Sequence, residues 1–193
     1  MLDAVLTRKN VSFKLKITVK TLVSAGVVAL AVALPQIVHA VLGAPGGVQW
    51  LPMYLPVLLG GCLLGTVWGL GVGIMSPITS FLITLAFGNP MPAAARLPYM
   101  IVELAVYGAV SGLFAKSIAK NCFMAFPAAL LASVAGRTVF LTVVAMFQSV
   151  SALSVATVWA QIQTGLLALV LQAVIVPVIV MAISFFANRQ DND

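Results

Sequence analysis

Six apolar runs, each close to the length of a bilayer crossing, dominate this sequence. A helix needs about 20 apolar residues to cross a hydrocarbon core of about 30 Å. The runs therefore predict an all-α integral membrane protein with six transmembrane helices, forming one membrane domain over residues 1–193. Residues 1–18 form a basic segment before the first run, and 188–193 form a polar tail. The expected helices cover roughly 19–40, 52–67, 68–87, 97–115, 123–147 and 159–187.

Composition supports the membrane class and argues against an enzyme. The chain is 62% hydrophobic and 7% charged, whereas a soluble domain carries about 25% charged residues. The sequence lacks His-Glu-x-x-His, Gly-x-Ser-x-Gly and the phosphate loop Gly-x-x-x-x-Gly-Lys-Ser/Thr. A single histidine, His39, cannot build a metal cluster with the few carboxylates available. We therefore expect no catalysis, no cofactor and no metal, and any ATP-driven step would need other chains.

The distribution of basic residues predicts the orientation. Lys and Arg accumulate on the cytoplasmic side of membrane proteins. With six crossings and a cytoplasmic N-terminus, the external loops hold only Arg96 and the C-terminus is also cytoplasmic. The net charge of +6 then indicates contact with anionic lipid rather than nucleic acid. The basic residues on the predicted cytoplasmic side are Arg8, Lys9, Lys14, Lys16, Lys20, Lys116, Lys120 and Arg189.

The N-terminal segment up to Val38-His39-Ala40 also has features of a signal peptide. Its basic start is unusually long for such a peptide, and its apolar run is long enough for a full crossing. We therefore expect the segment to remain as the first helix.

Glu103 is the only carboxylate between Asp3 and Asp191, and it lies inside an apolar run. A charge at the centre of a membrane helix costs at least ~2.5–3.5 kcal/mol unless it is paired or solvated. At a rise of about 1.5 Å per residue, Glu103 and Arg137 fall at a similar depth, each ~9 Å from the external surface. The two residues are expected either to form a neutral structural pair or to line a ligand cavity. Both roles are compatible.

Further polar and aromatic residues gather on the same predicted external side. Trp50 and Tyr99 are also typical of an interfacial aromatic belt, and His39 of a helix end. Gln172, deeper in the last run, fits a bridge between helices. The asymmetry favours a pocket open to the outside. Its candidate binding residues are Gln36, His39, Trp50, Asn89, Arg96, Tyr99, Glu103, Arg137 and Gln163.

Small residues recur every fourth position in the first run, at Ala25, Ala29 and Ala33. Such a stripe lets a second helix approach closely. Packing within the protein and docking of a partner are both compatible with it.

Several blocks share their order and spacing with a known family. They are Ala33–His39 (ALPQIVH), Tyr54–Gly61 (YLPVLLGG), Ser76–Leu82 (SPITSFL), Leu97–Gly108 (LPYMIVELAVYG), Ala135–Arg137 (AGR), and Leu171-Gln172 with Pro177. Through these blocks the chain resembles the substrate-binding S components of energy-coupling factor (ECF) transporters.

The resemblance implies six helices in a prokaryotic cell membrane and a vitamin-sized ligand near the external face. It further implies that Ala25 and Ala29, with Ala33 continuing the row, dock a transmembrane coupling subunit. Two ATPase subunits would power uptake.

Two other functions remain open on the residues alone. A secondary transporter would use Glu103 for proton coupling, although no pair of matching Gly/Pro-broken helices marks an inverted repeat. A structural membrane protein would use Glu103 and Arg137 only as a pair.

Overall fold

The computed structural model describes residues 2, 6, 12–147 and 153–189, without the side chains of 44–48 and 186–189. Arg8 and Lys9 of the basic segment, and the tail beyond Arg189, lie outside this part of the chain. Every regular element within it is helical. The elements are α2 (Phe13–Trp50), α3 (Tyr54–Leu64), α4 (Thr66–Ala86), α5 (Leu97–Leu113), α6 (Ala115–Lys120), η1 (Cys122–Met124), α7 (Ala125–Phe147) and α8 (Val155–Arg189).

The predicted all-α membrane class is confirmed, with four helical stretches long and apolar enough to cross a bilayer. They are Phe13–Gly43, Thr66–Ala86, Cys122–Phe147 and Val155–Phe185. The helices α3 and α5 have 11 and 17 residues, and α3 spans only about 16 Å at 1.5 Å per residue. The chain is therefore a helical multi-pass membrane protein, while six crossings and the orientation of the termini remain predictions.

Helix boundaries follow the predicted runs, with differences at glycines. The first helix continues past the predicted end at residue 40 to Trp50, with a break at Gly43, where φ is 70°. The second and third runs are separated by one residue, Gly65, with φ 91°. A positive φ is readily adopted only by glycine. A short helix, α6, also follows α5 and was not expected.

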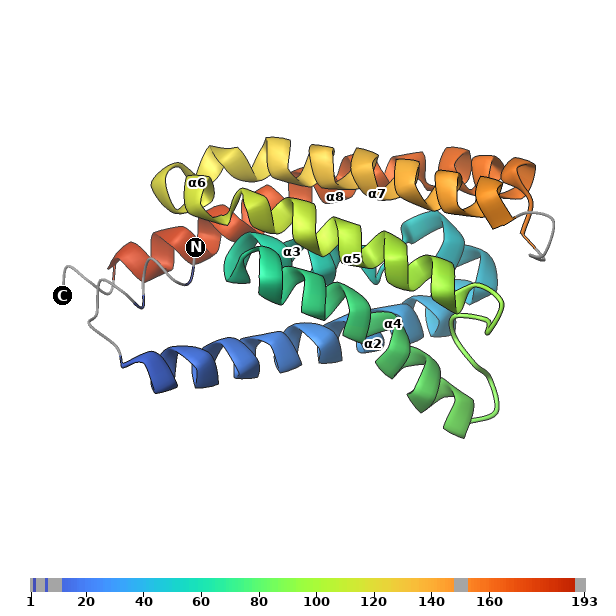
Figure 1. Ribbon diagram of the computed structural model, residues 1–193, viewed down its shortest axis with the longest axis horizontal. Coiled ribbons are helices and arrows are strands. Elements are labelled where there is room, and N and C mark those ends of the chain that lie inside the picture. The colour runs from blue at the N-terminus through green and yellow to red at the C-terminus, as the bar shows by residue number, and fades with distance from the viewer. Residues whose placement is uncertain (1, 3–5, 7–11, 148–152, 190–193) are drawn as a thin grey trace.

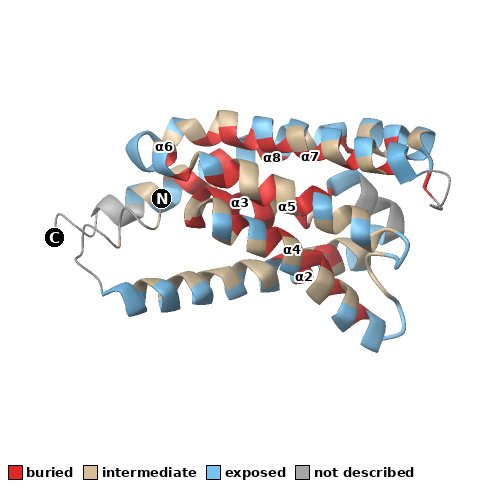
Figure 2. Cartoon of the chain, viewed as in Figure 1, coloured by how far each residue is buried: buried red, intermediate tan, exposed pale blue. Residues whose placement is uncertain are grey.

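The helices form an elongated bundle in which α3 and α5 occupy the centre (Figure 1). The pair α7 and α8 runs along one side of the bundle, and α2 runs along the opposite side. The start of α2 and the end of α8 lie at the same end of the bundle. Figure 2 shows the buried residues concentrated along α3, α5 and the inner faces of α4 and α7, whereas the first half of α2 is largely exposed. The large exposed apolar side chains include Leu22, Val67, Leu82 and Val134, as a lipid-facing surface requires.

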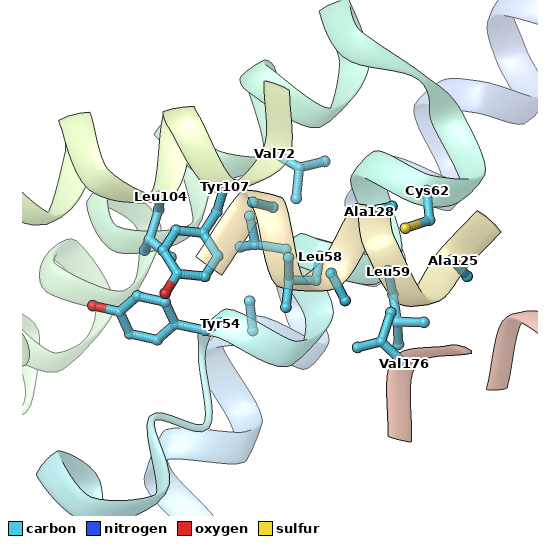
Figure 3. Packing of buried hydrophobic residues seen from close by; sticks show 14 of the residues in the cluster. Tyr54, Leu58, Leu59, Cys62, Val72, Leu104, Tyr107, Ala125, Ala128 and Val176 are labelled. Carbon is cyan, nitrogen blue, oxygen red and sulfur yellow. The ribbon is translucent and has the colours of Figure 1, made fainter. Parts of the chain in front are cut away.

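Helix α3 ends just before Gly65 and is enclosed by its neighbours. Val57, Leu58 and Cys62 are fully buried, and α3 contacts α2, α4, α5 and α8. Figure 3 shows Leu58 and Cys62 in one apolar cluster with Val72 of α4, Leu104 of α5 and Val176 of α8. Val57 belongs to the same cluster. A helix that is apolar on all sides belongs in the interior of a bundle.

Glycines let α3, α4 and α5 pack with their backbones almost in contact. A Cβ atom at Gly69 would overlap the carbonyl of Gly108, and one at Gly73 would overlap the carbonyl of Leu104. A Cβ at Gly61 would strike the same carbonyl of Gly108. Gly61, Gly69 and Gly73 therefore serve internal packing, whereas the Cβ position at Gly71 is open.

Replacing Gly73 with alanine is expected to destabilise the bundle by about 1–3 kcal/mol, because the added methyl group forces α4 away from α5. Gly71→Ala is the matched control on the same helix, and it should be neutral or slightly stabilising since alanine is the better helix former. Thermal unfolding of both variants in detergent measures the difference. Equal midpoints would contradict the close packing.

Candidate functional site

A cavity of about 300 Å³ opens between the ends of several helices. Its wall combines apolar side chains with a small polar set, a composition typical of small-molecule sites. The lining comes from α2 (Pro35, His39), the α2–α3 connection (Leu51, Pro52, Met53), α3 (Tyr54), α4 (Ser80), the α4–α5 loop (Met91, Pro92, Ala93, Arg96), α5 (Met100, Glu103), α7 (Arg137, Phe140) and α8 (Gln161).

Glu103, Arg137 and Tyr54 form a compact buried group in this wall. Arg137 Nη1 lies 2.9 Å from Glu103 Oε1, and the Tyr54 hydroxyl donates a hydrogen bond of 2.7 Å to Glu103 Oε2. The guanidinium carbon of Arg137 lies 4.9 Å from the centre of the Tyr54 ring. Glu103 is 0% exposed and Arg137 7%. The predicted proximity of the two charges is confirmed, and both carboxylate oxygens face protein partners.

The ion pair leaves part of the hydrogen-bonding capacity of Arg137 unused. Glu103 Oε1 accepts no well-aligned hydrogen bond despite its 2.9 Å distance from Nη1. Arg137 Nε and Nη2 also lack partners among the described residues, although both are buried. Buried polar atoms are nearly always hydrogen-bonded. The pair is therefore not fully satisfied by well-aligned hydrogen bonds, and neither Nε nor Nη2 is reached by solvent.

Tyr107 packs against Tyr54 of this group, and Gly136 leaves space for the Tyr107 ring. The rings of Tyr54 and Tyr107 meet edge to face with centres 5.0 Å apart, and Figure 3 shows both hydroxyls at the same end of the apolar cluster. A Cβ at Gly136 would overlap the Tyr107 ring. The glycine before Arg137 therefore lets α7 approach α5 closely enough for the ion pair to form.

The position of Tyr54 is fixed by the connection between α2 and α3. Leu51 has a left-handed backbone conformation with φ 48°, which is unusual for a residue with a large side chain. Gln172 of α8 donates from Nε2 to the carbonyls of Leu51 at 3.0 Å and Trp50 at 3.3 Å. The predicted bridging role of Gln172 is confirmed. This bridge holds the turn from which α3 begins.

The loop between α4 and α5 is fastened to α4 by polar side chains. Ser80 Oγ donates to the carbonyl of Met91 at 2.8 Å, and Met91 N donates to Thr84 Oγ1 at 2.7 Å. This attachment brings Met91, Pro92 and Ala93 to the cavity. Arg96 follows in the same loop, immediately before α5 begins at Leu97.

Four of the nine predicted binding residues line the cavity: His39, Arg96, Glu103 and Arg137. The other five lie elsewhere. Asn89 and Gln163 are exposed, and Trp50 is 37% exposed. Tyr99 packs with a small cluster around Phe140 and Val144, and Gln36 Nε2 is buried without a partner among the described residues.

Sequence reasoning did not select Tyr54, Ser80 or Gln161 for the binding set, although all three line the cavity. A signal for Ser80 exists, because Ser76, Ser80 and Thr84 recur every fourth residue and all three are buried. Tyr54 carries no comparable signal, since its partner Glu103 is 49 residues away.

A second depression lies on the outside of the bundle between α2 and α4. It has a volume of about 820 Å³, and the three alanines of the predicted stripe line it. Ala25, Ala29 and Ala33 are all exposed, so the described residues leave the stripe uncovered. Trp68 of α4 also lines the groove, with Lys20 Nζ 6.0 Å from the centre of its ring.

Comparisons with protein-family models, with curated proteins and with solved structures give no match for this chain. The fold and the two depressions place the chain in a class: it is a helical multi-pass membrane protein with a cavity and a separate apolar groove.

Removing either charge of the ion pair is expected to destabilise the fold by about 3–5 kcal/mol, because the remaining charge stays buried and unpaired. The tested variants are Glu103→Gln, Arg137→Gln and the double variant, compared by denaturant unfolding. The double variant should lose clearly less stability than the sum of the two single losses. Additive losses would contradict direct pairing.

Proposed function

We propose that the chain is the substrate-specificity component of an ECF-type importer, which binds a vitamin or a related micronutrient in its cavity. The observation that carries the proposal is the cavity beside the Glu103–Arg137 pair. A neutralised pair in the wall, a few further polar side chains and an apolar lining together form a setting for a small molecule with a few polar groups. Some of the residues that carry the resemblance, among them Pro35, Tyr54, Glu103 and Arg137, also line the cavity.

The groove between α2 and α4 supplies the second part of the proposal. Small residues on an exposed helix face allow a partner helix to pack closely within a membrane. A transmembrane coupling subunit would occupy the groove, and two ATPase subunits bound to it would hydrolyse ATP. In this arrangement the chain performs no catalysis, spans a prokaryotic cell membrane and opens its cavity to the outside.

Occupancy of the cavity is tested by native mass spectrometry of the purified protein. The wild type is expected to carry one small molecule as a mass adduct. Ala93→Trp, which fills the cavity from an exposed loop position, should lose most of this adduct. Ala95→Trp, exposed on the same loop but outside the lining, should retain it. Absence of any adduct from the wild type, or equal adducts in both variants, would contradict the proposed site.

Docking in the groove is tested with Ala29→Trp, since an indole there would keep a partner helix at a distance. The tagged variant should co-purify with far less coupling subunit and ATPase than the wild type, while its mass adduct is retained. Ala40→Trp, an exposed alanine of the same helix outside the groove, is the control. Undiminished recovery of partners with Ala29→Trp would remove the groove from the interface.

A further inference from the structure

We infer that the cavity selects a small organic carboxylate with an apolar body, and that Arg96 rather than Arg137 binds its charge. The inference rests on the proposed function, because it specifies the ligand of the same site.

The charges of the side chains that line the cavity do not cancel. Among the described residues, three charged side chains line the cavity: Arg96, Glu103 and Arg137. Glu103 and Arg137 neutralise each other across 2.9 Å, and Arg137 is additionally stacked on the Tyr54 ring. The cavity therefore carries one uncompensated positive charge, that of Arg96. A cationic ligand would be repelled by Arg96, and it would find the only carboxylate of the lining already paired.

The surroundings of Arg96 favour an anionic group on the ligand. Its side chain is partly buried and lines a mostly apolar cavity. Among the described residues, no acidic side chain forms an ion pair with it, and the Glu103–Arg137 contact is the one ion pair found there. The planar guanidinium matches a carboxylate with two parallel hydrogen bonds. A carboxylate would thus pair directly with a partly desolvated cation that interacts electrostatically with Glu103 but forms no ion pair with it.

The remaining lining specifies the rest of the molecule. Met53, Met91 and Met100 provide adaptable apolar surface, and Phe140 adds an aromatic face. The volume of about 300 Å³ lies at the lower end of the range for small-molecule sites, about 300–1,000 Å³. This size suits a body of one ring or a short chain.

The test uses three probes that share one apolar body and differ in charge: 4-phenylbutyrate, 4-phenylbutyramide and 4-phenylbutylamine. Dissociation constants are measured with the full-length protein in detergent for the wild type, Arg96→Gln and Arg96→Lys. Lys116→Gln, which removes an exposed charge outside the cavity, is the control. The acid is expected to bind the wild type about tenfold more tightly than the amide or the amine, since charge-assisted hydrogen bonds are the stronger class.

Arg96→Gln should erase this preference, whereas Arg96→Lys should keep part of it and Lys116→Gln should keep all of it. The inference is overturned when the acid fails to bind the wild type, when the amide or amine binds as tightly, or when Arg96→Gln leaves the preference intact. Each of these results leaves the proposed function standing as long as the wild type carries its native mass adduct. A wild type without that adduct contradicts the proposed function itself.

Discussion

The buried contact between Glu103 and Arg137 is the interaction on which the rest of the structure depends. A carboxylate and a guanidinium are tolerated in an apolar bundle only when they meet each other, and here they meet across α5 and α7. The Tyr54 hydroxyl adds the start of α3 to the same point. Three helices that are distant in sequence are thus brought together at one place, and the cavity lies beside it.

Close backbone packing makes this meeting possible. Gly69 and Gly73 let α4 pack closely against α5. Gly136, the residue before Arg137, leaves space for the Tyr107 ring. The pair neutralises itself, so the charge left facing the cavity belongs to Arg96 on the loop fastened by Ser80 and Thr84. The apolar groove between α2 and α4 is lined by residues separate from those of the cavity. Ligand selection and partner docking can therefore be served by different parts of one small chain.

Sequence reasoning succeeded where a physical constraint acts on a single residue. An isolated charge in an apolar run must find a partner, which predicted the approach of Glu103 to Arg137, and a buried glutamine must bridge helices, as Gln172 does. It failed where position depends on tertiary packing. Trp50, Asn89 and Gln163 are polar or interfacial like the true lining residues, but the kink at Gly43 and the fixed loop after α4 direct other side chains to the cavity. The same reasoning could not predict that α3 would end after 11 residues.

The most direct test of the account is a cryo-electron microscopy map of the wild-type protein in a lipid nanodisc, purified without added ligand. The account predicts one compact non-protein density in the cavity, with one end at the guanidinium of Arg96 and the other near Arg137, while Glu103 remains in contact with Arg137 and Tyr54. A cavity closed by its own side chains, or a density that does not contact Arg96, would contradict it.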